Sequence, residues 1–67
     1  MKIIRIALKD ILENLNISRY ELAKRTEIKF QTIDNYYKNR VIRYDSAILL
    51  KICIALDCTI DELIKIE

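Results

Sequence analysis

Apolar residues recur along most of the chain with the period of an α-helix. In the first such stretch they occupy positions i, i+3, i+4 and i+7, whereas Lys9, Asp10 and Glu13 occupy the opposite face. The apolar positions of this stretch are Leu8, Ile11, Leu12 and Leu15. The pattern therefore predicts an amphipathic helix that ends at Asn16.

Side chains that cap helices predict where further helices begin. Ser18 with Glu21, and Thr59 with Glu62, have the spacing of a capping box, in which each side chain binds the backbone N–H of the other residue. Asp45 can cap another helix through its carboxylate. Together with the apolar period, these signals predict helices over residues 18–26, 30–38, 46–56 and 59–64.

The side chains expected to face inward come from the first three of these later helices. In chain order they are Leu22, Ala23, Ile33, one of Tyr36 and Tyr37, Leu49, Leu50, Cys53 and Leu56. Five helices joined by short loops make an all-α fold. The β-branched ends, residues 3–6 and 64–66, alternate loosely. They form either a short strand pair or extensions of the first and fifth helices, and the pattern fits both.

Composition excludes several classes of protein. The chain has 67 residues, is 52% hydrophobic and carries a net charge of +2, which is not the composition of a disordered tail. Charges interrupt every apolar run too early for a membrane helix, and the first residues do not resemble a signal peptide. Because glycine and histidine are absent, we expect no phosphate loop, no metal or other cofactor, no small-molecule substrate and no enzymatic activity. The spacing of Cys53 and Cys58 favours reduced thiols and a cytoplasmic location.

The charges are distributed unevenly along the chain. Residues 16–43 hold seven basic and three acidic side chains, whereas residues 44–67 hold two basic and five acidic ones. A nearly neutral chain therefore has a basic middle and an acidic end. This asymmetry indicates a side that faces a polyanion.

The middle of the chain resembles the helix-turn-helix of the Cro and phage-repressor family, also called the xenobiotic-response-element family. The resemblance is carried by residues 22–28 (LAKRTEI) and by Thr32-Ile33, which stand at the spacing of that motif. Residues 50–56 and 59–63 resemble the fourth and fifth helices of the family, so the similarity spans roughly residues 6–64. It implies a five-helix lambda-repressor-like domain over residues 1–67, with the motif at about 19–38, in which Ile28 and Ile33 are core residues.

The resemblance also implies which residues contact DNA. In this family the second helix of the motif enters the major groove. The expected base-contacting residues are Phe30, Gln31, Thr32 and Asn35. The expected phosphate-contacting residues are Ser18, Arg19, Lys29, Tyr37, Lys38, Asn39, Arg40 and Arg43. Phe30 either packs on thymine methyl groups or belongs to the core. Asp34, on the expected outward face, either accepts from a cytosine amine or pairs with Lys38.

The function that these features imply is sequence-specific regulation of transcription. We expect a repressor that binds double-stranded DNA as a homodimer on a palindromic operator. The apolar terminal segments, residues 3–6 and 63–66, are candidates for the dimer surface. The alternative is a protein-interaction module of the same fold, such as an antitoxin-like or anti-repressor adaptor. Salt-dependent binding to a duplex distinguishes the two.

The absence of glycine predicts where the backbone is left-handed. Relatives commonly have glycine at four turns, which align here with Asn16, Glu27, Asn39 and Asp57. Asn and Asp tolerate positive φ better than other residues with a Cβ, so these three should adopt it with little strain. Glu27 does not have this tolerance, and we expect strain at that turn.

Overall fold

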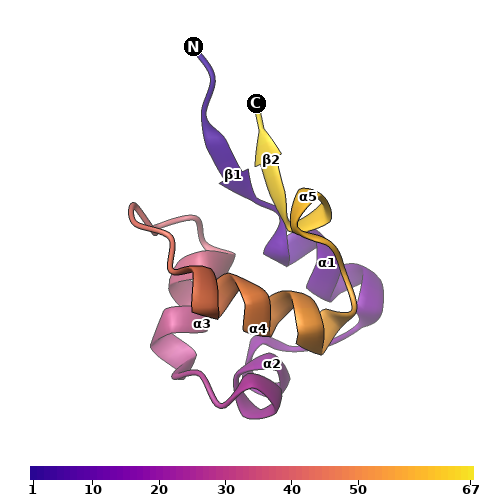
Figure 1. Ribbon diagram of the computed structural model, residues 1–67. Coiled ribbons are helices and arrows are strands. Elements are labelled where there is room, and N and C mark those ends of the chain that lie inside the picture. The colour runs from indigo at the N-terminus through magenta and orange to yellow at the C-terminus, as the bar shows by residue number, and fades with distance from the viewer.

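The chain begins and ends in two short strands with five helices between them. The computed structural model describes all residues 1–67 and places β1 at Ile4–Ile6 and β2 at Ile64–Ile66. The helices are α1 (Leu8–Leu15), α2 (Arg19–Thr26), α3 (Phe30–Tyr37), α4 (Ser46–Leu56) and α5 (Ile60–Leu63). The helical architecture expected from the pattern is therefore confirmed, and the terminal segments form the strand pair (Figure 1). No helix has the length and apolar character needed to cross a bilayer.

The predicted caps form at the starts of three helices. The Ser18 hydroxyl accepts from the Glu21 N–H at 3.0 Å, but the Glu21 carboxylate pairs with Arg25 instead of reaching back, so only half of that capping box forms. Asp45 accepts from the second residue of α4 at 2.8 Å. At α5, the Glu62 carboxylate accepts from the Thr59 N–H at 2.9 Å. These bonds satisfy donors that a helix start leaves without partners.

The two strands pair antiparallel and bring the ends of the chain together. Ile4 lies opposite Ile66, and Ile6 lies opposite Ile64. Ile6 is buried, whereas Ile4 and Ile66 are 50% and 69% exposed at the outer end of the ribbon. Because side chains alternate along a strand, one face of this ribbon is apolar and continues outward from the core.

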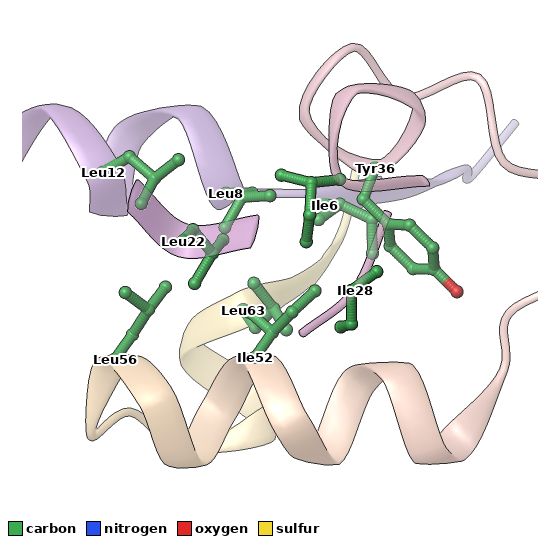
Figure 2. Close-up of a cluster of buried hydrophobic side chains, with 10 residues drawn as sticks. Ile6, Leu8, Leu12, Leu22, Ile28, Tyr36, Ile52, Leu56 and Leu63 are labelled. Carbon is green, nitrogen blue, oxygen red and sulfur yellow. The ribbon is translucent and has the colours of Figure 1, made fainter. Parts of the chain in front are cut away.

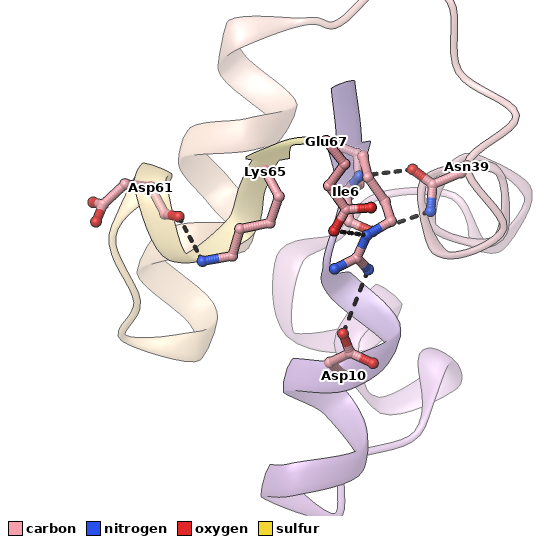
Figure 3. A network of polar contacts seen from close by, with 7 residues as sticks. Ile6, Asp10, Asn39, Asp61, Lys65 and Glu67 are labelled. Atoms are coloured by element: carbon pink, nitrogen blue, oxygen red, sulfur yellow. Dashed lines mark hydrogen bonds and ion pairs between the residues drawn. The ribbon is translucent and has the colours of Figure 1, made fainter. Parts of the chain in front are cut away.

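A polar contact anchors the ribbon to the helices. The Asn39 side chain accepts from the Ile6 N–H at 2.7 Å and donates to the Ile6 carbonyl at 3.1 Å (Figure 3). Nearby, the Arg5 guanidinium bonds Glu67 at 2.9 Å. The amide of Asn39 thus imitates a neighbouring strand and satisfies both backbone groups of Ile6.

The core gathers side chains from every helix and from β1. Its buried members are Ile6, Leu8, Leu12, Leu22, Ile28, Ile33, Tyr36, Ile52, Leu56 and Leu63 (Figure 2). The prediction for α4 was partly wrong, because Leu50 is 60% exposed and Ile52 is fully buried in its place. Leu15, expected on the inner face of α1, is also largely exposed. Between Tyr36 and Tyr37, the inward residue is Tyr36, whose hydroxyl accepts from the Asp45 N–H at 3.1 Å.

The left-handed turns are the four predicted from the missing glycines. The φ angles are 55° at Asn16, 59° at Glu27, 58° at Asn39 and 51° at Asp57, and no other residue has positive φ. Asn16, Glu27 and Asp57 each end a helix, where the change of hand stops the helical hydrogen bonding. Glu27 is the one residue of the four that has neither glycine's freedom nor the short side chain of Asn or Asp.

Candidate nucleic-acid interface

The turn between α2 and α3 is short and internally bonded. Only residues 27–29 separate the helices. The buried Thr26 hydroxyl donates to the Leu22 carbonyl at 2.8 Å and accepts from the Ile28 N–H at 3.3 Å. Ile28 and Ile33 are buried in the core, as expected. These contacts fix the angle at which α3 leaves the turn and leave one face of α3 towards solvent.

Two linked amides lie on the open face of α3. Gln31 is exposed and Asn35 is half-buried, and the Gln31 side-chain NH₂ donates to the Asn35 side-chain oxygen at 3.0 Å. Thr32, also predicted to contact bases, is half-buried. In this arrangement the Gln31 oxygen can still accept and the Asn35 NH₂ can still donate. The pair therefore presents one acceptor and one donor side by side.

Phe30 is neither a core residue nor a solitary exposed ring. It is half-buried and stacks on Tyr20 of α2, with ring centroids 4.2 Å apart and an angle of 15° between the planes. Tyr20 itself is 71% exposed. The stacked rings of Tyr20 and Phe30, which we call the Phe30–Tyr20 step, lie at the starts of α2 and α3. Tyr20 was not among the residues predicted from the sequence; an aromatic residue two positions before the inward Leu22, and so on the opposite side of α2, is the signal that could have identified it.

Asp34 is buried and not on the outward face, which corrects the expectation for this residue. It is 7% exposed. One carboxylate oxygen accepts from Arg19 at 2.5 Å, and the other accepts from Arg40 at 2.7 Å and lies 3.4 Å from Lys38. The predicted pairing with Lys38 is confirmed, and two arginines join it. Burial alone would raise the pKa of Asp34, but the hydrogen bonds from Arg19 and Lys38 outweigh it and hold the pKa below its ordinary value.

Aromatic rings hold Arg19 as well. Its guanidinium carbon lies 4.5 Å from the centre of the Tyr37 ring and 5.8 Å from that of Phe30. A cation over an aromatic face is attracted by the ring quadrupole. Arg19 therefore has a defined position while its side chain remains 34% exposed.

Five of the predicted phosphate-contacting residues lie close together. They form a cluster of cations around Asp34 and a neighbouring cleft, and Arg19 belongs to both. Arg19, Lys38 and Arg40 surround Asp34, and a cleft of about 390 Å³ beside the start of α2 is lined by Ser18, Arg19 and Tyr37 among others. Lys29 precedes α3, and Arg43 lies in the loop after it; both are exposed and neither has an ion-pair partner. Asn39 is the exception, because its side-chain amide is already used by Ile6.

The two cysteines are reduced and half-buried near the end of α4. Burial, together with the neighbouring Cys53, raises the pKa of Cys58 to about 11. A thiol in this state is a poor nucleophile and a poor metal ligand. No cluster of three His, Cys, Asp or Glu side chains is arranged to hold a metal ion.

Comparison with known proteins agrees with this geometry. The family model for the Cro/C1-type HTH DNA-binding domain matches residues 7–67, from the residue before α1 through β2 to the last residue. No curated protein matches the chain. The match includes α2, the turn and α3 together with the helices that support them. The chain belongs to the Cro/C1-type helix-turn-helix DNA-binding family.

Proposed function

We propose that this DNA-binding domain is a sequence-specific transcriptional repressor that acts as a homodimer on a palindromic operator. The observation that carries the proposal is the linked Gln31–Asn35 pair on the open face of α3, together with the partly exposed cations that bind the neighbouring Asp34. A solvent-facing pair of amides, one exposed and one half-buried, on a helix that the family places in the major groove is suited to reading base edges.

The amide pair has the donor and acceptor that adenine requires. Adenine offers its N6 amine as a donor and N7 as an acceptor in the major groove. The free Gln31 oxygen can accept from N6, and the free Asn35 NH₂ can donate to N7. Thr32 and the Phe30–Tyr20 step stand beside this pair and can contact thymine methyl groups. We therefore expect an A·T base pair in each half-site.

The phosphate contacts are proposed on both sides of that pair. Lys29 and Arg43 have no partner in the chain, and Arg19, Lys38 and Arg40 keep exposed side-chain surface although they pair with Asp34. Ser18 and Tyr37 line the cleft at the start of α2, where backbone N–H groups favour an anion. We leave Asn39 out of the phosphate set because its side chain is used within the fold.

A dimer follows from the small contact surface of one domain. Two copies related by a two-fold axis would read half-sites about 34 Å apart, one helical turn of DNA. We propose that the outer apolar face of the ribbon, formed by Ile4 and Ile66, contacts its counterpart in the second copy. Sedimentation of wild-type protein and of Ile4→Lys tests this: the variant should be monomeric at concentrations where the wild type is a dimer. Repression would follow from occupancy, because a dimer in the groove excludes other proteins.

The test of DNA recognition is a selection from random-sequence duplexes at low salt. The expected result is an enriched palindrome whose log affinity falls with log salt by several units per dimer. Lys29→Ala should weaken binding to every sequence alike, whereas Gln31→Ala should relax the preference at one base pair only. If no duplex is enriched above background, the regulator proposal fails.

One observation favours the alternative of a protein-interaction module. Asp34 neutralises part of the charge on three cations that a DNA-binding role would use. If this neutralisation prevents DNA binding, the selection will enrich no duplex, and the fold would then serve an antitoxin-like or anti-repressor adaptor.

A further inference from the structure

Asp34 is the one acidic residue of α3. Both of its oxygens are occupied, one by Arg19 and the other by Arg40 and Lys38. A buried acid in a surface built to meet phosphates reduces its attraction for DNA. Because Asp34 weakens the attraction for DNA, we looked for a contribution to DNA binding that offsets this loss.

We propose that Asp34 is a positioning residue that increases the selectivity of the domain for its operator over other DNA. It fixes three phosphate-contacting cations in one arrangement, and it lowers the attraction of that surface for DNA of any sequence. This inference rests on the DNA binding proposed above.

The three cations that Asp34 positions come from two parts of the fold. Arg19 opens α2, Lys38 caps the end of α3, and Arg40 lies in the loop beyond it. They therefore approach Asp34 from both ends of the helix-turn-helix. Long basic side chains have many rotamers in solution, and an ion pair held at 2.5–3.4 Å removes much of that freedom before DNA arrives.

The three cations are held without being covered. Their side chains are 34%, 50% and 52% exposed for Arg19, Lys38 and Arg40, against 10% for the side chain of Asp34. Each cation can thus donate to a phosphate while it still bonds the carboxylate behind it. Asp34 is itself shielded from the phosphates by the groups that it holds.

The negative charge of Asp34 contributes to selectivity in a second way. Attraction between basic side chains and phosphates does not depend on base sequence, so it strengthens wrong and right complexes alike. One carboxylate among three cations lowers this shared attraction. The fixed geometry of the cations helps only the complex in which the amide pair also meets its bases. Both effects raise the ratio of operator affinity to non-specific affinity.

The test compares three variants on two probes. The probes are the duplex recovered from the selection and a shuffled duplex of the same length and base composition. Asp34→Asn removes the charge, and Asp34→Glu keeps the charge but moves it outward by one methylene. Glu21→Gln is the matched control, because it removes one negative charge from an exposed pair with Arg25 that is not part of this cluster.

The expected results differ among the three variants. Asp34→Asn should bind the shuffled duplex more tightly, with a salt slope steeper by about 0.9 per bound monomer, and its affinity ratio should fall about tenfold. Asp34→Glu should keep the wild-type salt slope, but its ratio of affinities for the selected and the shuffled duplex should still fall. Glu21→Gln should keep the wild-type ratio. Partial unfolding lowers both affinities by one factor, so the ratio reports positioning even in a destabilised variant.

Two outcomes separate this inference from the proposed function. If the wild-type protein binds the selected duplex and the Asp34→Asn ratio equals that of Glu21→Gln, Asp34 only supports the fold and the inference is overturned. If the wild-type protein enriches no duplex at all, DNA recognition itself is wrong.

Discussion

Replacing Glu27 with glycine should make the protein more stable. Glu27 ends α2 with φ 59° and ψ 24°, in the left-handed region that disfavours any residue with a Cβ. Its side chain is exposed and takes part in no hydrogen bond or ion pair, so its removal breaks no contact of that kind. The substitution therefore changes the backbone preference and little else in the folded state.

The expected size follows from two opposing effects. A left-handed residue other than glycine, asparagine or aspartate is strained by about 1–2 kcal/mol, which glycine relieves. Glycine also gives the unfolded chain more freedom, which offsets about 0.5–1 kcal/mol of that gain. The net stabilisation should be about 0.5–1 kcal/mol. For a domain of this size, it raises Tm by about 2–8 °C.

Thermal and urea unfolding followed by circular dichroism measure this change. Glu27→Ala is the main control, because alanine removes the carboxylate but keeps the Cβ and should give no comparable gain. Asn16→Gly is a second control at φ 55°, where asparagine already tolerates the left-handed region and the gain should be smaller. A lower Tm for Glu27→Gly, or an equal rise for Glu27→Ala, would refute the argument from backbone strain.

Three further predictions concern other parts of the fold. Asn39→Gly, which keeps the left-handed turn free of strain at φ 58°, removes both bonds to the Ile6 backbone and should cost about 2 kcal/mol in urea unfolding, with faster amide exchange at Ile6; Asn39→Ala, which adds the strain of a Cβ at that turn, should lose more. The fold lowers the pKa of Asp34, Asp61 and Glu62. Stability from these carboxylates is therefore fully present above their ordinary values of 3.8–4.5 and should disappear as pH falls through the lower folded pKa values, which a Tm series from pH 7 to 2 measures. With its pKa raised from 9.0 to about 11, Cys58 should react with iodoacetamide at pH 8 about a hundredfold more slowly in the folded protein than in urea, as mass spectrometry can follow.

Caps and turns could be predicted from the sequence. The buried face of α4 was predicted wrongly, because apolar residues occupy nearly all of that helix. The caps at Ser18 and Asp45 and the four left-handed turns depend on a few neighbouring residues, and all were confirmed. In α4, however, apolar residues occupy nearly every position of SAILLKICIAL. The period then has no polar face to mark the outside, and the exposed Leu50 could not be told from the buried Ile52.

Contacts between distant residues account for the rest. The Asp34–Lys38 pair was predictable because the two residues are one helical turn apart, whereas Arg19 reaches Asp34 across 15 positions. Asn39 was correctly expected at a left-handed turn, but its bond to Ile6 spans 33 positions. A side chain that was assigned to DNA from its place beside α3 is therefore occupied inside the protein. Only the folded arrangement shows which polar groups are already in use.

The pairing of the two ends also determines when the fold can be completed during synthesis. β1 is translated before the five helices and its partner β2 after them, and Ile4 pairs with Ile66. The helices α1 to α3 involve only nearer neighbours, so they can form while β1 still lacks its partner strand. Asn39 is translated in time to bond Ile6 before β2 exists. The order of translation thus gives the amide of Asn39 a temporary role, in which it holds an apolar strand in place until the rest of the ribbon arrives.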